Sequence, residues 1–171
     1  YKASPILSIN PTIQMAMAFS KDRLSPMVRD TKVLSEVMQT NRTKDGSNTI
    51  LHKAFRGGQL TLAGSNSPAS LASRPVKVVL ADEIDRYGTT SEGDPLLLGQ
   101  KRAATFIDRR FIFTSTPTID GASRIQDEYK LSSQGIYEVP CPFCSTYQQL
   151  VWDNITYKKE DLSTIKYKCC S

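Results

Sequence analysis

The stretch that most constrains the fold of this chain is residues 76–87, which read VKVVLADEIDRY. Four of its first five residues are aliphatic, and the carboxylates of Asp82 and Glu83 follow the apolar run. An aliphatic strand without polar alternation is typical of a central parallel strand that is buried on both faces. Carboxylates just after such a strand are expected at the carboxyl edge of the sheet, where open α/β folds bind ligands. The stretch therefore predicts a layered α/β protein with a site at that edge.

The rest of the chain alternates predicted strands with predicted helices. Two alternating runs, 49–55 and 59–65, flank Gly57-Gly58 and predict a β-hairpin. This pattern favours a largely parallel sheet. The pattern changes near residue 137, so residues 1–136 are expected to form one domain and 137–171 a small second unit. Further strands are expected at 6–10, 76–81 and 109–116, and helices at 13–24, 29–39, 65–75, 92–106 and 121–135.

The two adjacent carboxylates suggest a specific chemistry. Asp82 can hold a magnesium ion that bridges nucleotide phosphates. Glu83, adjacent but pointing elsewhere, can orient and deprotonate an attacking water. This is the Walker B arrangement of P-loop ATPases. The alternative is an acidic turn after a strand, in which Asp82 or Asp85 caps a helix.

A second apolar strand ends in polar residues within FIFTSTPT, residues 111–118. Thr114, Ser115 and Thr116 are expected to emerge at the same sheet edge as Asp82. Hydroxyls placed there can sense the γ-phosphate of a nucleotide or its attacking water, since each can donate and accept a hydrogen bond. Thr114 is therefore a candidate nucleotide-binding residue. The alternative is an ordinary polar turn before a helix.

The four cysteines fall in the C-terminal part of the 171 residues. Cys141 and Cys144 form a Cys-x₂-Cys knuckle, and Cys169 lies further on, in a spacing that suits structural zinc. Free thiols are the alternative. No apolar run approaches the roughly 20 residues of a membrane helix, and no signal peptide is evident. These features predict a cytoplasmic protein, in which disulfides are uncommon.

The ordered blocks VVLADEIDRY, DPLLLGQKRAATF, FTSTPTIDGASRI and VPCPFCSTYQQLVW closely resemble the ATPase region of the large subunit of lambda-type phage terminases. The upstream segments ILSINPTIQMAMAFSKDRLSPMVRDT and LAGSNSPASLASRPVKVV match in the same order, so the resemblance covers essentially the whole chain. It implies a P-loop ATPase core of the ASCE type that packages double-stranded DNA into procapsids. The resemblance also implies that, in the intact protein, this motor is linked to an endonuclease.

The resemblance also implies roles for individual residues. Asp82 and Glu83 match the Walker B acid and base of the family. Ser115, Thr116 and Pro117 match its coupling motif, which links hydrolysis to DNA movement. Arg102 sits at a matching position and could act as an arginine finger on a neighbouring subunit, although a plain surface arginine is an equal alternative.

The chain departs from the family pattern in one respect. It contains no Gly-x-x-x-x-Gly-Lys-Ser/Thr loop to cradle phosphates, and in the family this loop lies upstream of the segment that matches residues 1–10. Because the chain begins with Tyr1 and stops within a cysteine motif, it is expected to be a piece of a longer protein that does not hydrolyse ATP alone. The sheet is expected to lack its P-loop strand, which would be the central one. This would leave a gap at its centre, or that place would be taken by an unusual partner strand or by a second copy of the chain.

In the family, the cysteine unit reads Cys-x₂-Cys, a long spacer, then Tyr-x-Cys-x₂-Cys. This implies that Cys169 is the third zinc ligand, that Cys170 is not a ligand, and that the fourth ligand falls just after Ser171. The C-terminal unit would then be a partial zinc ribbon.

The resemblance sets the expected partners and cofactors. The cofactors are ATP with Mg²⁺, and zinc in the cysteine unit. The partners are double-stranded DNA, the small terminase subunit, the procapsid portal and further copies of the chain, in the host cytoplasm. The net charge of +5 and pI of about 9.0 fit a polyanionic partner but occur in many other proteins. The alternatives are another P-loop DNA helicase or translocase, and a non-catalytic prophage-derived module for DNA binding or assembly.

Overall fold

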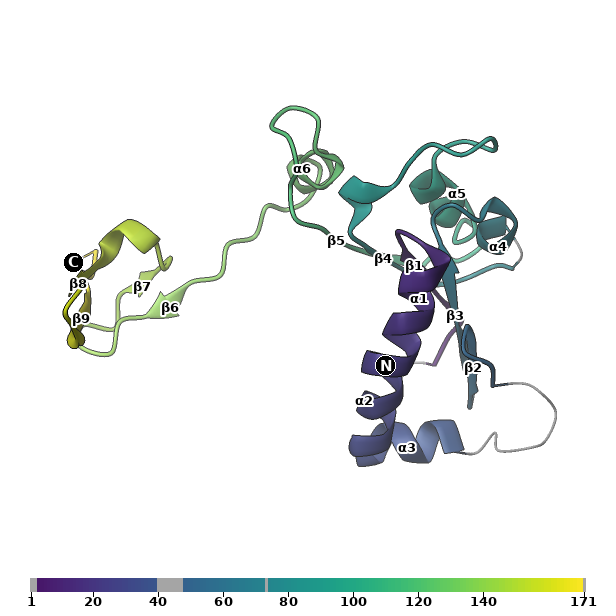
Figure 1. The fold of residues 1–171 in the computed structure, drawn as a ribbon, viewed down its shortest axis with the longest axis horizontal. Coiled ribbons are helices and arrows are strands. Elements are labelled where there is room, and N and C mark those ends of the chain that lie inside the picture. Colours follow the sequence, from purple (N-terminus) through teal and green to yellow (C-terminus); the bar gives the residue numbers. More distant parts are fainter. Residues whose placement is uncertain (1–2, 40–47, 73, 171) are drawn as a thin grey trace. The chain divides into compact units, whose positions relative to one another are not determined.

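The computed structural model describes residues 3–39, 48–72 and 74–170 (Figure 1). The chain divides into two units, Tyr1–Asp127 and Glu128–Ser171. The division falls within helix α6 (Arg124–Lys130), earlier in the chain than the predicted boundary at residue 136.

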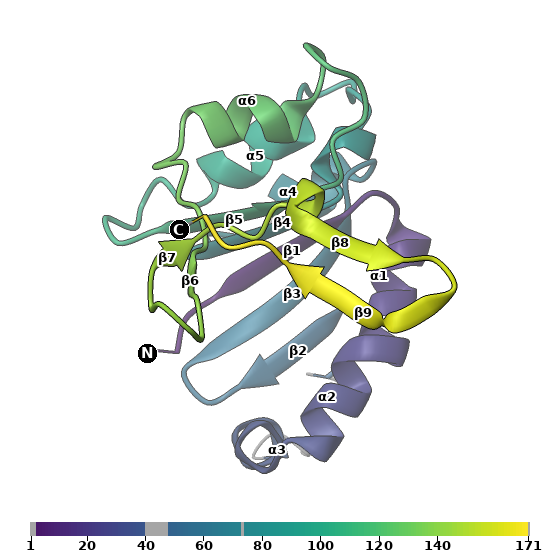
Figure 2. The same cartoon turned by 90° about the vertical axis from the view of Figure 1, so that its left-hand side faces the viewer.

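A five-stranded sheet organises the first unit (Figure 2). Its strand order is β2-β3-β1-β4-β5, in which β2 runs antiparallel to β3 and the other neighbours are parallel. The predicted hairpin, the three further strands and the mostly parallel sheet are thereby confirmed. The strands are β1 (Ile6–Asn10), β2 (His52–Phe55), β3 (Gly58–Gly64), β4 (Val78–Asp82) and β5 (Arg110–Thr114).

The helices follow the predicted order, with one difference. Thr12 caps the first helix, because its hydroxyl accepts a 3.2 Å hydrogen bond from the backbone N–H of Met15. The expected break between residues 24 and 29 is instead helical, since a proline stands in the first turn of α2, where its missing N–H is not needed. The helices are α1 (Ile13–Phe19), a π-helical turn (Ser20–Leu24), α2 (Ser25–Asp30), α3 (Lys32–Gln39), α4 (Pro68–Ala72), α5 (Pro95–Lys101) and α6.

Helices lie on both faces of the sheet (Figure 1). On one face, Ala16 of α1 packs with Leu62 of β3. On the other face, Leu96 of α5 packs with Ile9 of β1 and Val79 of β4. Successive residues of a strand point to opposite faces, so the two clusters together bury the centre of the sheet.

The prediction that β4 is buried on both faces is wrong for this structure. Val79 and Ala81 are buried on the α5 face, but Val78 and Leu80 on the other face are only partly buried. The reason is that α1 packs over β1 and β3 rather than over β4. The register pairs Leu80 with Ile112 of β5, which is 52% exposed.

The gap expected at the centre of the sheet is also absent among the described strands. β1 occupies the central position and pairs with both β3 and β4. Within the described residues, β5 pairs with β4 alone and forms the edge of the sheet. Any strand added to this parallel half of the sheet would therefore lie beside β5.

The second unit has almost no apolar core. It contains two short antiparallel ladders, β6 (Val139–Pro140) with β7 (Tyr147–Gln148) and β8 (Ile155–Lys158) with β9 (Asp161–Tyr167). Of its described residues, only Cys141 and Gln148 are buried. Units this small with so little core need a cross-link, a metal ion or a partner for stability.

Gly64, at the end of β3, permits the close approach of α1 to the sheet. A Cβ atom at this position would lie 2.5 Å from the backbone nitrogen of Ile13 and 2.8 Å from the carbonyl carbon of Thr12. Because backbone atoms cannot yield as a side chain can, we expect Gly64→Ala to lower the free energy of unfolding by about 3 kcal/mol. Urea unfolding followed by circular dichroism measures this change.

Gly88 provides the matched control, because a Cβ atom there meets no other atom within 4 Å. We expect Gly88→Ala to change the free energy of unfolding by less than about 0.5 kcal/mol. Equal effects of the two substitutions would contradict the packing role of Gly64.

Candidate functional site

Two neighbouring strand ends meet at the carboxyl edge of the sheet. The register pairs Asp82, the last residue of β4, with Thr114, the last residue of β5. The hydroxyl of Thr114 donates a 2.7 Å hydrogen bond to Oδ1 of Asp82. Ser115 and Thr116 follow directly, and the hydroxyl of Ser115 accepts a 3.2 Å hydrogen bond from the backbone N–H of Asp85. The structure thus brings together the acidic turn and the hydroxyl cluster that the sequence singles out.

The chain turns sharply at Glu83, whose backbone has a left-handed conformation with φ of 57°. A short 3₁₀ helix, Ile84–Arg86, follows, and the fully buried Ile84 anchors it to the core. Oε2 of Glu83 lies 3.2 Å from Nε of Arg86, whose side chain is 62% exposed. A pair this exposed contributes little to stability. Asp82 therefore ends the strand, while Glu83 belongs to the turn after it.

Asp85 is the most highly bonded carboxylate at this edge. Its Oδ2 accepts hydrogen bonds from the backbone N–H and the hydroxyl of Thr118, at 3.0 and 3.1 Å. Its Oδ1 accepts a 2.9 Å hydrogen bond from the backbone N–H of Ile125. Burial opposes ionisation of Asp85, but the hydrogen bonds from Ile125, Ser123 and Thr118 outweigh it and hold the pKa of the carboxyl below its ordinary value.

Two further polar residues lie at this edge, and the sequence analysis did not single them out. The hydroxyl of Tyr87 donates a 2.8 Å hydrogen bond to the carbonyl of Ile9, and burial, together with the charge of Asp82, raises the pKa of Tyr87. Asn10 ends β1, one residue after the Ile9–Ala81 pair, and therefore lies in the same row as Asp82. It is 4% exposed, and its Nδ2 has no hydrogen-bond partner among the described residues. Asn10 is the polar last residue of an apolar strand, and this is the signal that could have found it.

Arg102, the candidate arginine finger, lies away from this constellation. The carbonyl of Arg102 accepts a 3.1 Å hydrogen bond from the N–H of Val76, which places Arg102 near the amino end of β4. At about 3.3 Å per residue, Asp82 lies roughly 20 Å away along the strand. Arg124 forms a 2.7 Å ion pair with Asp94, the N-cap residue of α5. An arginine-finger role of Arg102 on a neighbouring subunit stays a prediction.

Three of the cysteines converge in the second unit. The sulfur atoms of Cys141, Cys144 and Cys169 lie within 4.8 Å of one another, and those of Cys144 and Cys169 are 3.6 Å apart. Two thiolates on one tetrahedral zinc ion, with Zn–S bonds of about 2.3 Å, would lie about 3.8 Å apart. Contacts with Thr146, followed by those with Cys141 and Cys169, lower the pKa of Cys144 to about 6, which favours the metal-binding thiolate. The cluster therefore fits a zinc ion, and Cys170 lies outside it.

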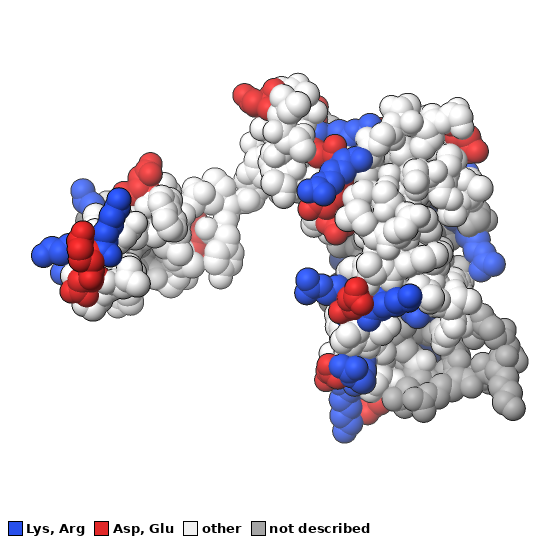
Figure 3. All heavy atoms as spheres, in the orientation of Figure 1, with Lys and Arg blue, Asp and Glu red and all other residues white. Residues whose placement is uncertain are grey.

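The surface charge does not by itself locate a DNA contact. On the face that Figure 3 shows, Lys and Arg side chains stand singly or beside Asp and Glu. Lys158 and Lys159 are exposed, as are Arg109 and Arg110. Within the described residues, no helix combines the length and the apolar character that crossing a membrane requires.

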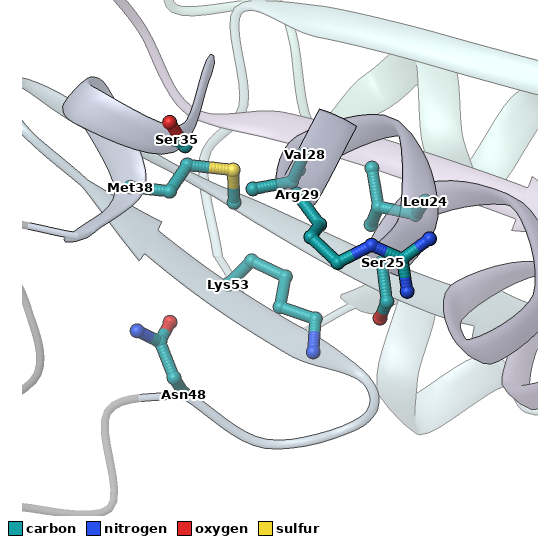
Figure 4. A pocket seen from close by; sticks show the side chains of 8 residues that line it. All are labelled: Leu24, Ser25, Val28, Arg29, Ser35, Met38, Asn48 and Lys53. Carbon is teal, nitrogen blue, oxygen red and sulfur yellow. The ribbon is translucent and has the colours of Figure 1, made fainter. Parts of the chain in front are cut away.

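A pocket of about 340 Å³ lies apart from the carboxyl edge, between α2, α3 and β2 (Figure 4). It combines apolar residues with two cationic side chains, two hydroxyls and one amide. The residues that line it include Leu24, Ser25, Val28, Arg29, Met38 and Lys53. It contains none of the strand-end residues described above.

The mixed α/β fold, with its mostly parallel sheet, fits the layered fold of P-loop NTPases. The family model for the ATPase domain of the phage terminase large subunit gpA matches residues 1–171. The chain belongs to this family.

Two terminase large subunits are similar to the chain over most of its length. The one from Enterobacteria phage P21 is 27% identical over 179 residues, covering 99% of this chain and 28% of that protein. The one from Escherichia phage lambda is 26% identical over 169 residues, covering 93% of this chain and 26% of that protein. The chain thus spans little more than a quarter of the length of these curated relatives.

Proposed function

We propose that this chain is the part of a DNA-packaging motor that carries the catalytic carboxylates and couples ATP hydrolysis to the movement of double-stranded DNA. The observation that carries the proposal is the hydrogen bond between Thr114 and Asp82 at the ends of paired parallel strands. It joins a carboxylate suited to a nucleotide-bound metal with a hydroxyl suited to sensing phosphate. The family match supports the same function.

Each strand-end residue has a proposed task. Asp82 would hold Mg²⁺, because an exposed carboxylate beside a hydroxyl supplies the hard oxygen ligands that this ion prefers. When bound with ATP, Mg²⁺ would neutralise charge that develops on the phosphates. Glu83 would accept a proton from the attacking water, and Thr114 would orient the γ-phosphate or that water. Ser115 and Thr116 would transmit the change to the surface that grips DNA.

A complete ATP site also needs a phosphate cradle. The sequence of the chain contains no Gly-x-x-x-x-Gly-Lys-Ser/Thr loop. We propose that the P-loop strand of the family pairs with the outer edge of β5, where the apolar Ile112 is 52% exposed. A cradle at the carboxyl end of that strand would lie beside Thr114.

The cysteine unit is proposed to hold structural zinc through Cys141, Cys144 and Cys169, with a fourth ligand beyond Ser171. The near absence of an apolar core in this unit supports a metal cross-link. A terminase would act in the host cytoplasm as an oligomer, with the small subunit, the portal and an endonuclease domain. The alternative, a different P-loop helicase or translocase, would explain the acidic turn. It would not explain the cysteine cluster.

Mg²⁺-dependent ATP turnover, with and without double-stranded DNA, tests this proposal. We expect the complete gene product that contains residues 1–171 to hydrolyse ATP at about 1 s⁻¹ or faster. We expect the 171-residue chain alone to be at least about a hundredfold slower, because it lacks the phosphate cradle. A malachite-green assay for released phosphate measures both.

The control is the chain alone mixed with the complete gene product, which excludes an inhibitor in the preparation. Turnover by the isolated chain at the full rate would contradict the proposed need for the cradle. A folded complete product that binds DNA without hydrolysing ATP would instead support the non-catalytic assembly module.

A further inference from the structure

Asp85 joins three parts of the first unit that are far apart in the sequence. It lies in the 3₁₀ helix directly after Glu83. Its carboxylate accepts hydrogen bonds from Thr118, in the segment after β5, and from the N–H of Ile125, in the first turn of α6. Its own N–H donates to Ser115. One residue therefore connects the turn that carries Glu83 to both ends of segment 115–125.

These hydrogen bonds hold a segment that burial does not hold. Residues 116–122 are all exposed, and burial resumes at Ser123, which is 1% exposed. An exposed segment without apolar contacts is free to move unless hydrogen bonds fix it. The position of residues 116–122 therefore depends on the side chain of Asp85, whereas the far end of the segment is also held by the buried Ser123 and by the ion pair of Arg124 with Asp94.

Resting on the function proposed above, we infer that Asp85 is a positioning residue that ties the movement of the Glu83 turn to segment 115–125 and the start of α6. Asp85 has no assigned contact with nucleotide or metal and acts through its hydrogen bonds to Ser115, Thr118 and Ile125. A movement of Glu83 on ATP hydrolysis would then move segment 115–125 with it. Without these hydrogen bonds, the segment would not follow the movement of Glu83.

The hydrogen bonds of Asp85 to Ser115, Thr118 and Ile125 form a joint between the Glu83 turn and segment 115–125. A carboxylate is the group that this joint requires. Both oxygens of Asp85 accept hydrogen bonds. The donors are the backbone N–H groups of Thr118 and Ile125 and the hydroxyls of Thr118 and Ser123. An asparagine keeps one acceptor oxygen and turns an NH₂ group towards N–H or O–H donors. Hydrogen bonds to an ionised acceptor are also about twice as strong as neutral ones. Asp85→Asn therefore removes the joint with almost no change in side-chain volume.

The test compares Asp85→Asn with Asp120→Asn in the complete gene product. Asp120 is an exposed carboxylate of the same segment, and it accepts a 3.4 Å hydrogen bond from Gln126. We expect Asp85→Asn to lower DNA-stimulated kcat by about tenfold or more, as the loss of charge-assisted hydrogen bonds implies, while KM for ATP changes less than about twofold. Asp120→Asn is expected to match the wild type. A purely structural defect would reduce the yield of folded protein and the basal turnover together. It would not lower DNA-stimulated kcat while leaving KM for ATP unchanged.

Hydrogen–deuterium exchange tests the joint without relying on turnover. We expect a slowly hydrolysed ATP analogue with Mg²⁺ to change the exchange of residues 115–125 in the wild type and in Asp120→Asn, but not in Asp85→Asn. Thr118→Val, which removes one donor and keeps the backbone N–H, should give a partial loss that is not additive with Asp85→Asn.

Two results would overturn the joint. One is a wild-type exchange response in Asp85→Asn, and the other is no response in a wild type that binds the analogue. Failure of the proposed function would look different. The wild type would then not hydrolyse ATP, whatever the exchange of residues 115–125.

Discussion

Glu83→Gln in the complete gene product should abolish nearly all ATP hydrolysis while leaving the protein folded and able to bind nucleotide. A glutamine cannot accept the proton of the attacking water, and positioned general bases contribute about 10²- to 10⁴-fold to rate. We therefore expect kcat to fall by at least about a hundredfold. Because Glu83 is placed in the turn and Asp82 in the strand, affinity for Mg²⁺-ATP should change by less than about threefold.

Glu92→Gln is the matched control for this substitution. Glu92 is an exposed carboxylate in the same unit, so the same chemical change there should leave kcat near the wild-type value. Single-turnover hydrolysis separates the chemical step from product release. If Glu83→Gln kept more than about a third of the wild-type rate, the acidic pair would be a structural turn and the non-catalytic assembly module would be favoured.

Removal of zinc should unfold the second unit while the first stays folded. With only Cys141 and Gln148 buried among its described residues, this unit has little apolar burial to replace the metal. Structural zinc in small domains contributes on the order of 10 kcal/mol to folding. We expect a strong chelator to make residues 128–171 of the complete gene product sensitive to protease.

Two cysteine substitutions sharpen this test. Cys144→Ser removes a member of the sulfur cluster, whereas Cys170→Ser changes a thiol outside it. The backbone N–H of Cys170 bonds the side chain of Gln148, and a serine preserves that contact. We expect Cys144→Ser to lose zinc by elemental analysis and to resemble the chelated protein, and Cys170→Ser to keep it. Retention of zinc by Cys144→Ser, or its loss from Cys170→Ser, would show that the ligand set is different.

Local signals in the sequence predicted the elements well. The first helix was expected to begin at residue 13, and α1 begins there, at Ile13. The paired glycines gave the β2–β3 hairpin, and the spacing of Cys141, Cys144 and Cys169 indicated a cluster that the structure brings together. Each of these features depends on near neighbours or on a known ligand geometry.

Features that depend on packing between distant segments were not predictable in the same way. An aliphatic strand does not reveal which face a helix covers, so the partial exposure of Leu80 was missed. The sequence pattern of α5 does not show that Arg102, the residue after its end, lies at the amino end of β4. The donors to Asp85 come from Thr118 and Ile125, which are 33 and 40 residues away in the sequence. Only the folded chain shows that these residues converge.

The left-handed backbone conformation of Glu83 implies a conflict between the stability of the fold and its activity. A residue other than glycine in this conformation costs about 1 kcal/mol or more. Glycine at position 83 would relieve that strain, so selection for thermal stability alone would favour it and remove the carboxylate. Engineering of a more stable variant should therefore hold position 83 fixed and look for gains elsewhere in the sheet.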